Sequence, residues 1–150
     1  MKLTFATRAN MAELVRVPAV DDWFTIDAEP RLIGSRCVEC GTYYFPKETF
    51  SCRNPSCSST VLEEVPLSNT GKIWSYAINH YPPPPPAVSS DPFEPYAVAA
   101  VELAEERMIV LGLVSGDIEA LRIGADVELV VDTLFKDEVN DNLVWKWVVR

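Results

Sequence analysis

The sequence predicts a mainly β protein with a short helical segment near its N-terminus, a small metal-binding ribbon and a C-terminal five-stranded barrel. Two observations support this prediction. All four cysteines lie between residues 37 and 57, and from about residue 70 onward the chain consists of β-rich runs separated by turns. Of its 150 residues, 48% are apolar and 23% are charged, which allows a core to be buried. We place the N-terminal extension at 1–35, the zinc ribbon at 36–66 and the barrel at 67–150.

The N-terminal extension contains the predicted helical segment. Pro18 and Pro30 bracket the stretch DDWFTIDAE, and an aspartate at position 21 or 22 is a suitable N-cap for one or two short helical turns. These turns would carry the apolar residues Trp23, Phe24 and Ile26.

The sequence also bears on the cellular compartment. No stretch approaches the roughly 20 apolar residues of a membrane-spanning helix, and the N-terminal residues lack the apolar core of a signal peptide. We therefore expect a cytoplasmic protein with no membrane partner. Because the cytoplasm is reducing, closely spaced cysteines there bind metal more often than they form disulfides.

The cysteines form two pairs, Cys37 with Cys40 and Cys52 with Cys57. Both spacings let two sulfurs reach one tetrahedral ion at about 2.3 Å. Four thiolates fill the coordination shell, so we expect a structural ion, one Zn2+ per chain. Iron can occupy the same four thiolates, and the sequence does not distinguish the two metals.

Five β-rich runs predict a small closed barrel of five antiparallel strands, and the OB-fold is the commonest barrel of that size and strand number. The runs are GKIWSYAINHY at 71–81, YAVAAVEL at 96–103, MIVLGLVS at 108–115, DVELVVDTLF at 126–135 and NLVWKWVVR at 142–150.

Alternation within the last two runs predicts which side chains share a face of each strand. The predicted sets are Val127, Leu129 and Val131, and then Leu143, Trp145, Trp147 and Val149.

A run of prolines, residues 82–86, separates the first two β-rich runs. Proline cannot donate a backbone hydrogen bond, so this segment is predicted to be an exposed loop. It serves either as a stiff spacer, the reading we favour, or as a ligand for a proline-binding partner.

Catalytic constellations are nearly absent from the sequence. His80 is the only histidine, and no thiol nucleophile remains if the cysteines bind metal. A Ser-His-Asp triad would need Asp91 or Asp132 to orient His80, and no serine lies in a G-x-S-x-G turn. We therefore expect that this chain is not catalytic alone.

Three motifs occur in a characteristic order. They are L-x-G-x-x-C-x-x-C-G at 32–41, the pair Phe45-Pro46, and Gly71-Lys72-Ile73 at the start of the barrel. In this order, over about residues 15–150, the chain resembles the rubredoxin-like zinc-ribbon plus OB-fold family long labelled a domain of unknown function. The wider spacing of the second cysteine pair and the proline run depart from the usual pattern.

The resemblance implies an accessory role. Members of that family look like small subunits beside thiolase-fold enzymes, including thiolases, hydroxymethylglutaryl-CoA synthase complexes and aldolases acting on steroid side-chain CoA thioesters. Others accompany hotdog-fold hydratases. In such assemblies the partner supplies the catalytic residues, and the small subunit shapes the acyl-CoA tunnel and stabilises the complex.

Residues on both sides of the first cysteine pair are the predicted contacts with a partner or with acyl-CoA. Trp23 and Phe24 precede the ribbon in a segment too short to form its own core, and Tyr44, Phe45 and Lys47 follow the first pair. Their apolar side chains would form a patch at the junction of the two modules. The alternative is that they pack between ribbon and barrel.

Single-stranded nucleic-acid binding is the competing function, because zinc ribbons and OB barrels both serve it. Tyr43, Tyr44 and Phe45 beside Lys47 and Arg53 would form a stacking platform. However, 13 basic and 22 acidic residues give a formal net charge of -9, whereas a phosphate-binding groove is normally basic. We therefore expect no nucleic-acid partner.

Overall fold

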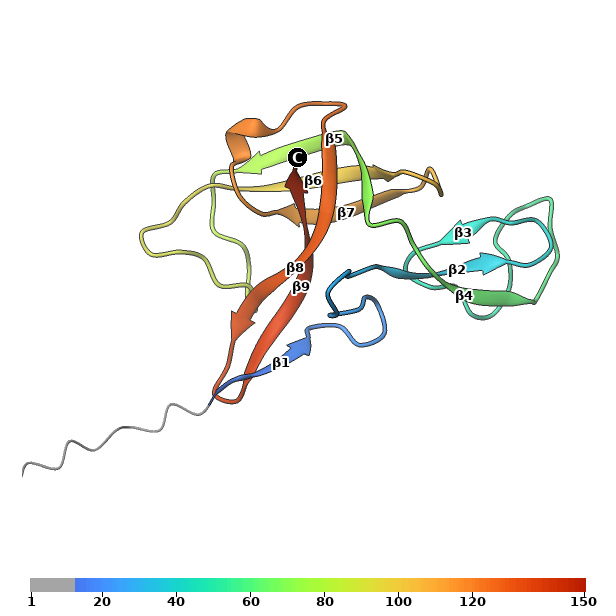
Figure 1. The fold of residues 1–150 in the computed structure, drawn as a ribbon, viewed down its shortest axis with the longest axis horizontal. Coiled ribbons are helices and arrows are strands. Elements are labelled where there is room, and N and C mark those ends of the chain that lie inside the picture. Colours follow the sequence, from blue (N-terminus) through green and yellow to red (C-terminus); the bar gives the residue numbers. More distant parts are fainter. Residues whose placement is uncertain (1–12) are drawn as a thin grey trace, which may run out of the picture.

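Two β-sheets make up the fold in the computed structural model, which describes residues 13–150 (Figure 1). The larger sheet contains β1 (Val15–Pro18), β5 (Thr70–Asn79), β6 (Tyr96–Leu103), β7 (Ile109–Val114), β8 (Asp126–Lys136) and β9 (Asn140–Val149). The smaller sheet contains β2 (Ile33–Cys37), β3 (Tyr43–Tyr44) and β4 (Leu62–Pro66), in the order β3-β2-β4. The predicted extension begins at residue 1, but residues 1–12 lie outside the described part of the chain.

Strands β5 to β9 close into a five-stranded barrel. The order in the large sheet is β1-β9-β7-β6-β5-β8, and a further pairing between β8 and β9 completes the circle. This closure confirms the predicted OB-fold barrel. The expectation that all five strands are antiparallel is wrong at one contact, because β7 and β9 pair in parallel through Leu113 with Lys146 and Val114 with Trp147.

The barrel core is apolar and contains the predicted faces of the last two strands. Val127, Leu129, Leu143 and Trp147 are each 2% exposed or less. The Trp147 indole lies against Gly112, where an added Cβ would come within 2.7 Å of Nε1. A glycine is therefore required on β7 for the indole to fill the centre of the barrel.

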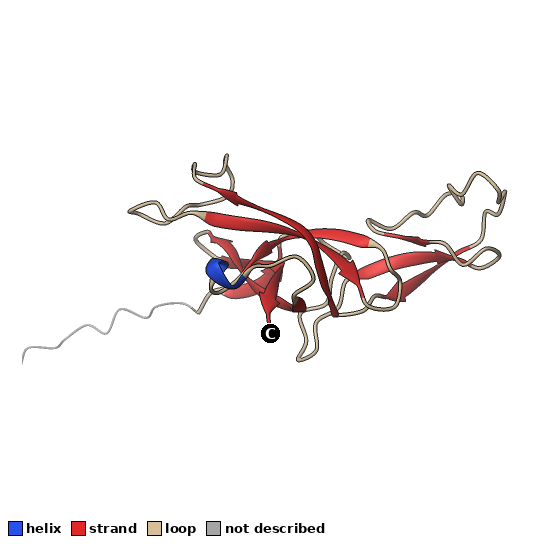
Figure 2. Ribbon diagram, turned by 90° about the horizontal axis from the view of Figure 1, so that it is seen from above, coloured by secondary structure: helices blue, strands red, loops and turns tan. Residues whose placement is uncertain are grey.

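The predicted N-terminal helical segment is wrong. Val15–Pro18 forms β1, parallel to β9, and Phe24 forms an isolated antiparallel bridge with Leu32. Asp22, one of the two predicted caps, has a φ of 60°, whereas an N-cap adopts an extended conformation. The free edge of β9 offers backbone hydrogen-bonding groups to this segment, which a sequence pattern does not reveal. The described residues contain one short helical element, the 3-10 turn η1 (Ile118–Ala120), which is blue in Figure 2.

The proline run lies where the sequence predicted it. Residues 80–95 connect β5 to β6 without forming a strand. A β-bulge between Ile73 and Ser75 interrupts the regular alternation of β5, with Ile73 buried and Trp74 exposed. Among the described residues, no helix has the length and apolar character needed to span a membrane.

Candidate metal centre

A tight turn after β2 brings the first two cysteines together. Cys37 is the last residue of β2, and the Gly41 N–H donates to the Cys37 carbonyl over 2.9 Å. Gly41 has a φ of 76°, a conformation that L side chains rarely adopt. Glycine at this position therefore allows the chain to turn back directly after Cys40.

The second pair lies in the long connection between β3 and β4. The Cys57 N–H donates to the Asn54 carbonyl, and the Cys52 N–H donates to the Ser59 carbonyl, each over 2.9 Å. These bonds fold the connection back on itself, so that Cys52 and Cys57 face the turn after β2.

The four sulfur atoms have the spacing of a tetrahedral metal site. All lie within 4.8 Å of one another, with 3.8 Å between Cys37 and Cys57 and 3.5 Å between Cys40 and Cys52. Four sulfurs bound at about 2.3 Å to one tetrahedral ion are about 3.8 Å apart. The four cysteines predicted from the sequence are therefore positioned to bind a metal.

Tyr44 of β3 supports Cys52 directly. Its hydroxyl oxygen accepts from the Arg53 N–H over 2.8 Å and lies 3.2 Å from the Cys52 Sγ. Because the hydroxyl oxygen is already an acceptor, its proton is available to the sulfur. Such hydrogen bonds hold a ligand in place and stabilise its negative charge.

Thr42 and Asn54 support Cys40 in the same way. The Asn54 side-chain amide donates to the Thr42 hydroxyl over 3.2 Å, and that hydroxyl lies 3.1 Å from the Cys40 Sγ. The same amide lies 3.8 Å from the sulfur. Cys40, the most exposed ligand, is thus held by two neighbouring polar side chains.

The pKa values of the cysteines are shifted in different directions. The hydroxyl and N–H of Thr42 lower the pKa of Cys40 to about 6, and the Cys40 N–H lowers the pKa of Cys37. The Ser59 N–H acts to lower the pKa of Cys57, but burial and the neighbouring sulfurs raise it to about 12. Four thiolates this close repel one another, and a divalent cation among them would offset that repulsion.

Three of the five predicted contact residues meet at the junction of ribbon and barrel. Trp23 and Phe24 from the segment after β1, and Phe45 from the ribbon, surround Trp145 of β9 with ring centroids 5.6 to 6.0 Å from it. The Trp145 indole N–H donates to the Leu111 carbonyl over 3.0 Å. This aromatic cluster attaches the ribbon to the barrel.

The other two predicted contact residues lie within the ribbon. Tyr44 faces Cys52, and the Lys47 ammonium pairs with the Glu64 carboxylate over 2.8 Å. That the five residues touch a partner or acyl-CoA stays a prediction. The structure does show that Phe24 is buried within this chain, with 4% of its surface exposed.

Sequence reasoning missed Thr42, Asn54 and the central role of Trp145. The first two carried a usable signal, because each is a short polar residue within three positions of a cysteine. Alternation places Trp145 on one face of its strand, but nothing in the sequence indicates that the ribbon packs on it.

Both modules of this chain match domains of known proteins. Residues 24–63 match the rubredoxin-like zinc ribbon domain of the ChsH2 type, and residues 64–132 match the C-terminal OB-fold domain of ChsH2. The boundary between the two matches falls within β4.

Relatives cover most of the chain. A DUF35 domain-containing scaffold protein of Methanocaldococcus jannaschii is 34% identical over 83% of this chain and 84% of its own length. The benzoylsuccinyl-CoA thiolase subunit BbsA of Thauera aromatica is 34% identical over 70% of this chain and 66% of its own length.

Among solved structures, a chain of the Ltp2-ChsH2(DUF35) aldolase superposes on this fold. The TM-score is 0.61 at 29% identity, covering 79% of this chain and 84% of that one. With a cysteine cluster in a ribbon, a closed barrel after it and relatives matched along most of their length, this chain belongs to the DUF35 domain family, which joins a rubredoxin-like zinc ribbon to an OB-fold domain.

Proposed function

We propose that this chain is a non-catalytic accessory subunit that binds a thiolase-fold enzyme acting on acyl-CoA thioesters. In the complex it shapes the substrate tunnel of the partner and stabilises the assembly. One observation carries the proposal: a relative named as a thiolase subunit and a solved aldolase chain both match this chain across ribbon and barrel. The partner is a thiolase or a retro-aldol lyase.

The outer face of the barrel supports a partner contact. The β5–β6–β7 sheet pairs Ser75 with Ala100 and Ala100 with Leu111, and Leu111 is 63% exposed. Trp74, at the bulge of β5, is 62% exposed. The water-facing side of an antiparallel sheet usually carries polar residues. Large apolar side chains exposed there are typical of a surface that a partner covers.

Co-expression tests this proposal. The tagged chain should retain a thiolase-fold protein encoded in the same genome through affinity and size-exclusion chromatography. Leu111→Glu should abolish co-elution, whereas Val139→Glu should not, because Val139 is equally exposed, at 63%, but lies in the β8–β9 turn. Turnover of acyl-CoA thioesters should require the complex. If the purified single chain cleaves or condenses them, the accessory role is wrong.

We further propose that the metal is zinc. Four thiolates in a closed tetrahedral shell are typical of structural zinc, and the site leaves no protein ligand position open for catalysis. Elemental analysis of the purified chain should give about one zinc per chain. A red protein with stoichiometric iron would overturn the assignment.

A further inference from the structure

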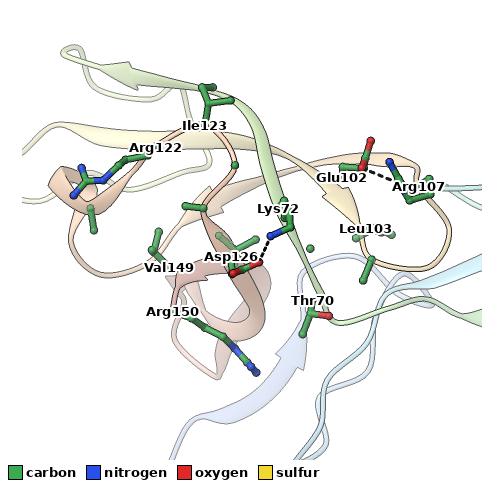
Figure 3. A pocket seen from close by; sticks show the side chains of 16 residues that line it. Thr70, Lys72, Glu102, Leu103, Arg107, Arg122, Ile123, Asp126, Val149 and Arg150 are labelled. Atoms are coloured by element: carbon green, nitrogen blue, oxygen red, sulfur yellow. Dashed lines mark hydrogen bonds and ion pairs between the residues drawn. The ribbon is translucent and has the colours of Figure 1, made fainter.

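Two cavities lie near opposite ends of β8. The larger one, the basic cavity, has a volume of about 1010 Å³, and Figure 3 labels the basic side chains that line it: Lys72, Arg107, Arg122 and Arg150. The smaller one has a volume of about 320 Å³. Val127 lines the basic cavity and Leu134 lines the smaller one, and along an extended strand these residues are about 20 Å apart. The smaller cavity is therefore a separate site.

The proline-containing connection between β5 and β6 forms one wall of the smaller cavity, and the barrel forms the other. From the connection come residues 83, 87–90 and 93–95. From the barrel come residue 96 of β6, residues 113–114 of β7, residues 133–134 of β8 and residue 146 of β9. The Glu94 N–H donates to the Ser90 hydroxyl over 2.9 Å, which folds this part of the connection back on itself. The connection thus covers a cavity as well as joining two strands.

The lining of the smaller cavity is mostly apolar. Nine of its fourteen residues are apolar or aromatic, and they include Phe93 and Tyr96 on one wall and Leu113, Val114 and Leu134 on the other. Its volume is at the lower end of the range for pockets that hold small organic molecules. Such pockets usually combine an apolar lining with a few polar groups that orient the ligand.

Lys146 provides the polar group that can orient a ligand here. This residue of β9 lies beside Leu113 of β7 in the sheet, and both line the cavity. Its ammonium donates to the Asp132 carboxylate and to the Thr133 carbonyl, each over 3.1 Å. Within residues 13–150 these bonds use two of the three N–H groups of the ammonium. The side chain is only 18% exposed, so an oxygen acceptor in the cavity would satisfy the third N–H group in place of water.

The charges around the cavity favour an uncharged ligand. Asp132 already offsets the charge of Lys146, and Glu94 adds a second carboxylate to the lining. A ligand carboxylate would therefore face more negative than positive charge. A ligand cation would be repelled by the ammonium and would offer no acceptor to its third N–H group. A carbonyl oxygen accepts this hydrogen bond without adding a charge.

We infer that the smaller cavity binds an uncharged, largely apolar molecule with a carbonyl oxygen, of which an aryl ketone is the simplest example. The carbonyl oxygen accepts from the Lys146 ammonium, and the ring lies between Phe93 and Leu134 on the two walls. This inference goes beyond the proposed accessory role and does not depend on it, because every lining residue belongs to this chain.

Titration of the full-length, metal-loaded chain with acetophenone, followed by amide NMR shifts, tests the inference. The shifts should be largest at residues 87–96, 113–114 and 133–134, with a dissociation constant in the millimolar range or below. Ethylbenzene, which lacks the carbonyl, and benzoate, which carries a charge, should each bind about tenfold more weakly, since a hydrogen bond to a charged group is lost or opposed by repulsion.

Two variants separate the roles of the ammonium and of the cavity. Lys146→Met keeps the apolar stem and should bind acetophenone about tenfold more weakly while binding ethylbenzene as before. Lys72→Met is the matched control, because Lys72 also pairs with an aspartate of β8, Asp126, but is 64% exposed and lines the basic cavity. Ala87→Trp should abolish binding of both molecules by filling the cavity from the connection. Thermal unfolding of each variant checks that the barrel is intact.

Three results would overturn the inference: no shifts at the lining residues with millimolar acetophenone, equal affinity for acetophenone and ethylbenzene, or tighter binding of benzoate than of acetophenone. Unchanged affinity of a folded Lys146→Met variant for acetophenone would likewise contradict it. The titration uses the single chain, so its outcome is independent of whether a thiolase-fold protein co-elutes with the chain.

Discussion

The hydroxyl of Tyr44 lies 3.2 Å from the sulfur of Cys52, and the same hydroxyl accepts a hydrogen bond from the backbone of Arg53. One side chain of β3 thus holds both a metal ligand and the residue that follows it. This contact links the small sheet of the ribbon to the cysteine loop, which has no strand of its own between β3 and β4.

Replacing Tyr44 by phenylalanine should lower metal affinity about 10–100-fold, the usual effect of losing a group that hydrogen-bonds a metal ligand. Competition against a chromophoric chelator measures this change. Tyr43→Phe is the matched control, because the Tyr43 ring lies over Arg36, at 5.5 Å, and its hydroxyl makes no hydrogen bond within residues 13–150. Equal affinity of the two variants would mean that the Tyr44 hydroxyl does not support the site.

Removing the metal should unfold the ribbon and leave the barrel folded. Besides Cys37 and Cys52, the ribbon buries small residues such as Ser35 and Ser59, so it has little apolar core without the ion. Amide hydrogen exchange after chelation should show lost protection in β2 to β4 and retained protection in β5 to β9. Equal loss in both modules would show instead that they unfold as one unit.

Replacing Phe24 by alanine should reduce the free energy of unfolding by about 3–5 kcal/mol, since the ring is 4% exposed and packs against Trp145 at 5.7 Å. Urea denaturation measures this loss. Phe50→Ala should change stability very little, because Phe50 is 84% exposed. A Phe24 variant as stable as the Phe50 variant would place Phe24 outside the core.

Asp137 should make the β8–β9 turn sensitive to acid. The Asn142 side-chain amide, and then the N–H groups of Val139 and Asn140, hold the pKa of Asp137 below its ordinary value. The carboxylate therefore stabilises the fold above its unfolded-state pKa of about 3.9, and this contribution is lost as the pH falls through the lower, folded-state pKa.

Asp137→Asn should consequently lower the free energy of unfolding at pH 7, and its difference from the unaltered chain should shrink toward pH 3. Urea denaturation across this range provides the measurement. Glu138→Gln, in the same turn, is the control, because Glu138 makes no side-chain hydrogen bond within residues 13–150. A deficit of Asp137→Asn that is constant with pH would contradict the assignment.

The metal ligands and most strands could be predicted because they depend on local pattern. Two turns suffice to bring Cys37, Cys40, Cys52 and Cys57 together, and spacing alone indicates such turns. The second barrel strand was predicted at 96–103, the bounds of β6, because apolar β-rich residues run between clear turn signals. Alternation likewise identified the buried faces of β8 and β9, since side chains in a strand alternate between two sides.

The sequence did not predict the contacts between residues that lie far apart along the chain. Val15–Pro18 became a strand because β9 offered it an edge, and Trp23, Phe45 and Trp145 met because the ribbon packs on the barrel. Lys72, Arg107, Arg122 and Arg150 surround one cavity because the barrel closes. By itself the sequence determined the metal ligands and the strand positions, which follow from spacing and period. Only the tertiary structure decided the aromatic junction, the parallel strand and the basic cavity, because long-range pairing and packing leave no local pattern.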